Sequence, residues 1–230
     1  MTDKQREQVA ETLRAFGLGD DDLAAWEDIR LPDEAFDDWL TDRVARRPAG
    51  ARARQVYAAE DLHDFARSAI LAALTLEPGD FLLEIGCGGG TLLRDALAAG
   101  ARATGLDHSA DMLELAMQRA TAAGLVLAAA QSLPFADDTF SAIAMSIVFM
   151  FLDAPIGVLG ECRRVLGRGG RLALFTISPQ LRGSPAAPEP IGSRCHLYPD
   201  EELAGLARRA GLRDATVHNS GGGQLLTARV

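Results

Sequence analysis

The stretch FLLEIGCGGGTL, residues 81–92, runs from apolar residues into a cluster of glycines and back into apolar residues. FLLEIG (81–86) has the composition of a short buried β-strand, and TLLRDALAAG (91–100) predicts a helix that Gly100 closes. Glycine lets the backbone approach a ligand and exposes the N–H groups of the following helix. A tight turn needs fewer glycines than GCGGG contains, so the stretch predicts a ligand-binding loop rather than a turn alone.

Strands and helices alternate from this loop onward. The expected strands are 81–86, 101–107, 125–130, 140–151 and 171–178, and the expected helices are 91–100, 109–124 and 155–167. This alternation predicts a parallel sheet with helices on both faces. The C-terminal part differs, because a helix at 200–211 precedes two strands, 213–219 and 224–230, joined by the glycine turn SGGG at 220–223. A short turn joins antiparallel neighbours. We therefore expect an α/β fold with a doubly wound, mostly parallel seven-stranded sheet and an antiparallel last strand.

Residues 1–75 have helical periodicity throughout, and we expect them to form an N-terminal helical cap on a domain of residues 76–230. Residues 1–42 hold 13 acidic against 4 basic side chains, whereas RVARRPAGARAR (43–54) holds five arginines and no acid. The charge pattern favours a solvated linker at 43–54, with contact to an anionic partner as the alternative. The cap either completes an acceptor pocket or forms a homodimer contact, and the sequence does not choose between these roles.

Composition excludes several classes of function. A net charge of −9 disfavours a general nucleic-acid binder. Three cysteines without CxxC spacing indicate neither a disulfide framework nor a zinc site, and a reducing cytoplasm is the expected location. No apolar run has the length of a membrane span, and the polar N-terminus does not resemble a secretory signal.

A carboxylate follows the second expected strand. ATGLDHS places Asp107 at the strand end, where a carboxylate can accept hydrogen bonds from both hydroxyls of a ribose. Together with the glycine loop, Asp107 indicates a nucleoside ligand. The loop has the spacing ExGxGxG from Glu84, and Thr91 stands where dinucleotide-binding loops have their third glycine. A nicotinamide cofactor is therefore disfavoured.

Four segments in this order, LLEIGCGGGTLL, GLDHSADML, QSLPFADDTF and ECRRVLGRGGRLALF, resemble class I S-adenosylmethionine (SAM)-dependent methyltransferases. The small-molecule branch with ubiquinone- and menaquinone-type enzymes is the most similar, and the tail HLYPDEELAGLARRAGLRDATV resembles it too. The resemblance covers residues 76–230. It implies a Rossmann-like methyltransferase fold, SAM as cofactor with S-adenosylhomocysteine (SAH) as product, and methyl transfer to a small, apolar or aromatic acceptor.

The resemblance also implies roles for individual residues. Those expected to bind the cofactor are Glu84, Gly86, Cys87 and Gly88 at the methionine part, Asp107 at the ribose, His108, Met112, Gln131, Ser132 and Leu133 at the adenine, and Ser146 and Ile147 near the sulfonium. Each side chain has a simpler interpretation. Cys87 and Met112 are also typical core residues, and His108 could be a surface histidine.

Candidates for the reacting centre are fewer. His196, in the long loop after the fifth strand, and His63, on the helix before the core, are the candidate bases, with Tyr57 as a positioning hydroxyl. Phe149, Met150 and Phe151 are candidates for the acceptor pocket, unless they only complete a buried strand. Metal-assisted transfer is not expected, since Asp153 is the single carboxylate near that segment.

Some residues depart from the family pattern. Ala129 stands where relatives commonly have an acid that accepts the adenine amino group, and Gln131 stands where Glu is frequent. The histidines that many relatives carry after the fourth strand are missing. These departures keep an alternative open, in which the same fold uses SAM as a scaffold for a non-methylating reaction. A macromolecular methyltransferase is disfavoured, because SIVF at the fourth strand end lacks the Asn/Asp-Pro-Pro-Tyr/Phe motif.

Overall fold

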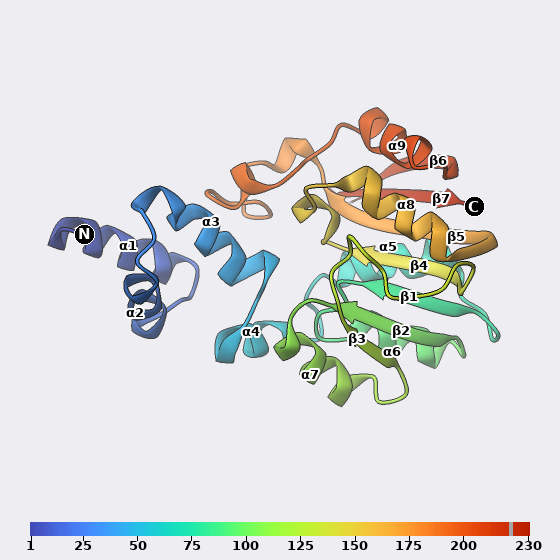
Figure 1. Ribbon diagram of the computed structural model, residues 1–230, viewed down its shortest axis with the longest axis horizontal. Helices are drawn as coiled ribbons and strands as arrows, with labels where there is room; N and C mark the ends of the chain where they lie inside the picture. Colours follow the sequence, from blue (N-terminus) through green and yellow to red (C-terminus); the bar gives the residue numbers. More distant parts are fainter. Residues whose placement is uncertain (221–222) are drawn as a thin grey trace.

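The computed structural model describes residues 1–220 and 223–230 and contains a seven-stranded sheet in the order β3-β2-β1-β4-β5-β7-β6 (Figure 1). The parallel strands are β1 (Phe81–Ile85), β2 (Arg102–Asp107), β3 (Gly124–Leu127), β4 (Phe140–Ser146) and β5 (Leu166–Ile177). The strands β6 (Arg213–Ser220) and β7 (Gly223–Arg229) pair antiparallel, and β7 also pairs antiparallel with β5. The expected mostly parallel sheet is confirmed; the turn expected at 220–223 includes residues 221–222, which lie outside the described residues.

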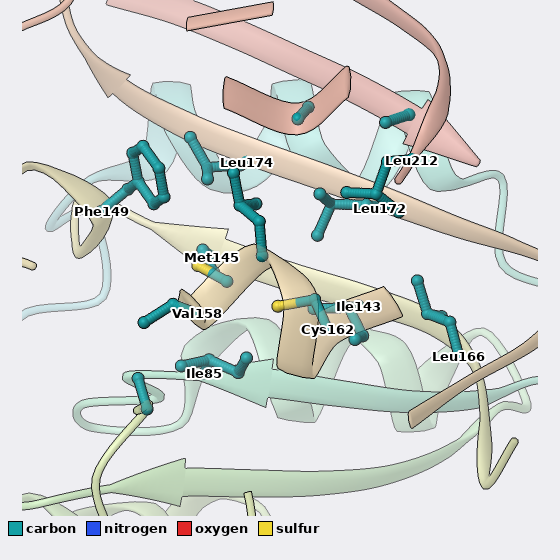
Figure 2. Close-up of a cluster of buried hydrophobic side chains, with 14 of the residues drawn as sticks. Ile85, Ile143, Met145, Phe149, Val158, Cys162, Leu166, Leu172, Leu174 and Leu212 are labelled. Atoms are coloured by element: carbon teal, nitrogen blue, oxygen red, sulfur yellow. The ribbon is translucent and has the colours of Figure 1, made fainter. Parts of the chain in front are cut away.

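Helices cover both faces of the sheet. One face carries α5 (Asp64–Leu74), α6 (Thr91–Ala98) and α7 (Ala110–Arg119), and the other carries α8 (Pro155–Val165) and α9 (Asp200–Arg209). Successive side chains of β4 point to opposite faces of the sheet, so they belong to two hydrophobic cores, one on each face. Ala142 and Ala144 pack with α5 and α6, whereas Ile143 and Met145 pack with α8. Figure 2 shows Ile143 and Met145 beside Val158 and Cys162 of α8.

The helices before the sheet are α1 (Asp3–Ala15), α2 (Asp20–Ile29), α3 (Phe36–Thr41) and α4 (Gly50–Tyr57). In Figure 1, α1 to α3 lie to one side of the sheet and α4 lies beside α7. Although residues 1–75 have helical periodicity throughout, α5 begins only at Asp64, because His63 has a left-handed conformation (φ 58°). Its apolar stripe, Ala66, Ile70 and Leu74, packs directly on the sheet.

The Arg-rich segment 43–54 is not a solvated linker, so that expectation was wrong. It contains a π-helical turn (Asp42–Arg46) and most of α4. Arg43 pairs with Asp22 at 2.8 Å, Arg46 with Asp38 and Asp42, and Arg54 with Asp111 of α7. Arginines of this segment thus form ion pairs with part of the acidic side chains of residues 1–42. These ion pairs order a segment that its composition alone describes as a loop.

Several boundaries also differ from expectation. The strand expected at 171–178 begins at Leu166, and the strand expected at 125–130 ends at Leu127. The strand expected at 140–151 ends at Ser146, because Ile147 has a positive φ of 57° and Phe149–Phe151 form a short 3₁₀ turn. The helix expected at 109–124 ends at Arg119, and Gly124 begins β3 instead of stopping a helix. Within the described ranges, none of the helices combines the length and apolar character that a bilayer crossing requires.

Candidate cofactor and acceptor site

A cavity of about 400 Å³ opens at the carboxyl ends of β1, β2 and β4. The chain reverses its winding direction between β1 and β4, which is where open α/β sheets bind ligands. The N-terminal segments 42–48 and 57–63 close the cavity from the other side. The predicted residues that line it are Tyr57, His63, Glu84, Gly86, Cys87, Gly88, Asp107, His108, Met112, Gln131, Ser146, Ile147 and Phe151.

Asp107 fixes the glycine loop from the end of β2. Its Oδ2 accepts a hydrogen bond from the Gly88 N–H at 2.9 Å, and its Oδ1 accepts one from the Ser109 N–H at 2.9 Å. Asp107 is 7% exposed. A carboxylate oxygen has two lone pairs, so each oxygen keeps one for a ligand hydroxyl. The cavity thus contains a preformed double acceptor of the kind that a ribose requires.

The glycines of the loop are needed partly by neighbouring protein groups. A Cβ on Gly86, whose φ is 72°, would overlap the Val148 side chain. A Cβ on Gly89 would lie 2.6 Å from the Tyr57 carbonyl oxygen, and one on Gly90 would lie 2.9 Å from the Ala116 Cα. The close approach that excludes side chains here therefore involves the segment after β4, α4 and α7. Access for a ligand is a second reason for the same glycines.

Glu84 is a buried acid with an unsatisfied oxygen. It is 3% exposed on β1 and lines the cavity, and its Oε2 has no hydrogen-bond partner. Burial and then the charge of Asp107 raise the pKa of Glu84 well above its usual value. A buried acceptor without a partner is costly. A cationic ligand group in the cavity would satisfy this oxygen, and the α-ammonium of SAM has that chemistry.

The loop after β2 is tied to the N-terminal segment. His108 Nε2 donates to the carbonyl oxygen of Arg46 at 2.5 Å, and Ser109 Oγ donates to that of Pro48 at 2.8 Å. The His108 ring thus holds the segment 46–48 across the mouth of the cavity. Of the residues expected at the adenine, Met112 and Gln131 line the cavity, as does Ala129. Ser132 and Leu133 lie outside the lining, since Ser132 is exposed and Leu133 is buried in the core.

The end of β4 forms another part of the wall. Ser146 and Ile147 line the cavity with Val148 and Phe151. The positive φ of Ile147 is rare for a β-branched residue, and such strain often occurs at functional sites. Phe149 and Met150 lie outside the lining, because the 3₁₀ turn directs them into two separate buried clusters. Of the three expected acceptor residues, Phe151 alone faces the cavity.

The candidate bases occupy different places. His63 lines the cavity half-buried, and desolvation lowers its pKa. Tyr57 lines it as well, and burial raises its phenol pKa to about 12, with Asp107 adding to the effect. His196 is outside the lining and forms a 3.2 Å contact through Nε2 with Asp153, a rim residue.

Sequence reasoning missed Val148 and the segment Arg46–Pro48 as parts of the wall. Val148 lay inside an expected strand, and the segment lay inside an expected linker. The proline in RRPAG was the available signal that this linker is a defined turn. Among the described residues, no group of three or more His, Cys, Asp or Glu side chains is arranged to hold a metal ion.

The sheet order, the glycine loop and the acids at the ends of β1 and β2 resemble those of class I SAM-dependent methyltransferase domains. Residues 83–174 match the family model described as "Methyltransferase domain". A demethylmenaquinone methyltransferase of Thermotoga maritima is 42% identical over 76 residues, which are 33% of this chain and 33% of that protein. The same enzyme of Thermus thermophilus is 35% identical over 123 residues, 51% of this chain and 56% of that protein. The chain thus spans one third to just over half of these curated relatives.

The fold also has close counterparts among solved structures. A SAM-dependent methyltransferase from Aquifex aeolicus superposes with a TM-score of 0.63 at 20% identity, covering 78% of this chain and 97% of that one. At this identity the likeness shows the fold alone. The sequence matches relate residues 83–174 to methyltransferase domains, and they support SAM as the cofactor.

Proposed function

We propose that this protein transfers the methyl group of SAM to a small acceptor with an apolar or aromatic reacting part. The observation that carries the proposal is the pair of acids across one cavity, Glu84 with its unpartnered Oε2 and Asp107 with one lone pair free on each oxygen. Their chemistry complements the α-ammonium and the ribose hydroxyls of SAM. When bound, SAM supplies an electrophilic methyl group on sulfur, so the protein has chiefly to bind and align.

Each part of the cavity has a proposed role toward the cofactor. Glu84 accepts from the ammonium, Asp107 accepts from the ribose, and Gly86, Cys87 and Gly88 border the methionine chain. His108, Met112 and Gln131 border the adenine, and Ser146 and Ile147 border the sulfonium. Ala129 provides no acceptor for the adenine amino group, so the amide oxygen of Gln131 is the proposed substitute. Ser132, which lies outside the lining, would contribute through backbone contacts alone. The Leu133 N–H donates to Glu161 and its carbonyl oxygen accepts from Arg164, so no direct contact with the cofactor is proposed for Leu133.

The acceptor side of the cavity supports an apolar substrate. Ile147, Val148 and Phe151 face it from the segment after β4, and Leu62 faces it from the N-terminal segment. His63 is the proposed base, because its lowered pKa keeps the imidazole neutral and ready to accept a proton at neutral pH. Tyr57 is the proposed positioning hydroxyl, since its raised pKa keeps it protonated. His196 would act only through Asp153 at the rim.

The N-terminal residues 1–75 are the proposed cap of this site. Support comes from the segments 42–48 and 57–63, which line the cavity, and from the bonds of His108 and Ser109 to this part of the chain. A cap role requires no second copy of the chain. Size-exclusion chromatography with light scattering measures whether a homodimer forms as well.

The first test is calorimetric titration of SAH into the ligand-free protein and into Asp107→Ala and Glu84→Gln. Micromolar binding to the wild type that both substitutions weaken supports the cofactor site. No binding to folded wild-type protein overturns the proposal. The second test incubates the protein with SAM and a panel of phenolic and prenylated acceptors and measures SAH. An acceptor that is converted without stoichiometric SAH would instead identify the non-methylating alternative.

A further inference from the structure

Arg119, the last residue of α7, joins the glycine loop to the end of α4 through all three guanidinium nitrogens. Its Nη1 donates to the Gly89 carbonyl oxygen at 2.6 Å and to that of Tyr57 at 3.3 Å. Its Nη2 donates to the Ala58 carbonyl oxygen at 2.8 Å, and its Nε lies 3.3 Å from Glu60 Oε1. The side chain is only 13% exposed, so these bonds form largely away from water. The planar fork of arginine suits such a junction, whereas one ammonium group does not.

The two Tyr57 and Ala58 carbonyl groups lie at the C-terminal end of α4, where helix carbonyls lack partners within the helix. A cation at this end also interacts favourably with the helix dipole. Arg119 therefore caps the C-terminal end of α4, although it belongs to a different helix. The end of α4 is fixed relative to the glycine loop rather than only to its own helix.

The Tyr57 ring lies against the glycine loop, next to this junction. A Cβ on Gly88 would be 3.4 Å from Tyr57 Cδ1, and a Cβ on Gly89 would be 2.7 Å from Arg119 Nη1. The ring thus rests on the loop whose N–H group Asp107 holds. Tyr57 lines the cavity, whereas Arg119 does not. Any influence of Arg119 on the site must pass through Tyr57 and the loop.

We propose that Arg119 is a positioning residue, which holds the Tyr57 ring against Gly88 and thereby sets both the cofactor loop and the wall of the acceptor cavity. The importance of this position for binding rests on the proposed function above. The placement of Tyr57 by Arg119 does not, so it can be measured on the ligand-free protein.

The chain has two tyrosines, Tyr57 and Tyr198, which permits a direct spectroscopic test. Protein grown with 3-fluorotyrosine gives one ¹⁹F resonance for each, and Tyr198→Phe assigns them. Fluorine makes the phenol more acidic, which brings its titration into a milder pH range. We expect Arg119→Gln to shift the residue 57 resonance and to lower its phenol pKa toward that of the free amino acid. Arg119→Lys should give an intermediate result.

Arg163→Gln is the matched control, because Arg163 also bonds to a loop carbonyl, that of Gly211 at 3.2 Å, but lies outside the cavity lining. A residue 57 resonance that stays unchanged in Arg119→Gln, or that moves equally in Arg163→Gln, overturns the proposal. Calorimetry supplies the second measurement. Arg119→Gln should weaken SAH binding about tenfold in the wild-type background and have little further effect in Tyr57→Ala, since residues that act as one unit are not additive.

Additive losses in the two backgrounds would show that Arg119 acts independently of Tyr57 and would also overturn the proposal. The two measurements separate the possible failures. If wild-type protein binds no SAH, the proposed function fails, and the ¹⁹F result still decides whether Arg119 places Tyr57.

Discussion

Oδ2 of Asp107, at the end of β2, accepts a hydrogen bond from the backbone N–H of Gly88, at the turn after β1, at 2.9 Å. One carboxylate thereby shapes the loop and faces the cavity with its remaining lone pairs. The two parallel strands β1 and β2 are neighbours in the sheet, so their carboxyl ends bring these residues together over 19 positions of sequence.

Replacing Asp107 tests both tasks of the carboxylate. In Asp107→Asn the amide nitrogen cannot accept an N–H bond, so either Gly88 or Ser109 loses its acceptor. A hydrogen bond to a charged group contributes about 1.5–3 kcal/mol. We therefore expect SAH affinity to fall about 10- to 100-fold by calorimetry. Glu114→Gln, an exposed acid on α7, is the control and should bind as the wild type does. Unchanged affinity in Asp107→Asn would exclude Asp107 from the cofactor site.

Glu84 should make the stability of the ligand-free protein fall with rising pH. Its folded-state pKa is raised, so between its unfolded and folded pKa values the native state binds more protons than the unfolded state. The free energy of unfolding then decreases as pH rises through that window. Glu84→Gln cannot ionise and should lose this component. Urea denaturation from pH 5 to pH 8 should show a shallower decline for the variant.

Glu161 should have the opposite effect on the pH dependence of stability, because its pKa is lowered in the folded state. The hydrogen bond from Arg164, with a further one from the Leu133 N–H, lowers the pKa of Glu161 to about 2. The ionised Glu161 therefore stabilises the folded state above the pKa that it has in the unfolded chain, and this stabilisation is lost as pH falls through its pKa in the folded state. Glu161→Gln should therefore lose more stability at neutral pH than near pH 3. For Glu84, a free energy of unfolding that depends on pH equally in Glu84→Gln and in the wild type would contradict the raised pKa of this residue.

Gly86→Ala should be strongly destabilising. The residue has a φ of 72°, and an added Cβ would overlap the Val148 side chain. Strained backbone and overpacking each cost about 1–3 kcal/mol. The midpoint of urea unfolding should fall accordingly, and Val148→Ala in the same chain should restore part of the loss. Gly160→Ala is the matched change, because a Cβ there meets nothing within 4 Å in α8. It should be neutral or stabilising by about 0.5–1 kcal/mol.

His108→Ala should loosen the N-terminal segment without unfolding the sheet. It removes the bond to the Arg46 carbonyl oxygen, one of the ties between segment 46–54 and the loop after β2. Amide hydrogen exchange should accelerate over residues 46–57 and remain slow in β1 and β4. His218→Ala, an exposed residue on β6, is the control. Unchanged exchange over 46–57 would show that the other ties, at Ser109 and Asp111, suffice.

The sequence by itself determined the alternation of strands and helices, the glycine loop after β1 and the acid at the end of β2. Local pattern is sufficient for these, because buried strands, helix periods and glycine turns have their own signatures. It also predicted the family and the cofactor, since four ordered motifs lie on the loops that the sheet brings to one edge. The cavity contains most of the residues so named.

Only the tertiary structure decided which other residues pack against those loops and line the cavity. Phe149 and Met150 turn away from the cavity because Ile147 ends β4 early, and that conformation has no local signal in a run of apolar residues. The order of segment 43–57 depends on partners far away in sequence: Asp22, Asp111 and Arg119. Long-range ion pairs and helix-end contacts form only when the chain is folded. The sequence therefore predicts the cofactor loop, and the packing around it decides what the site can hold.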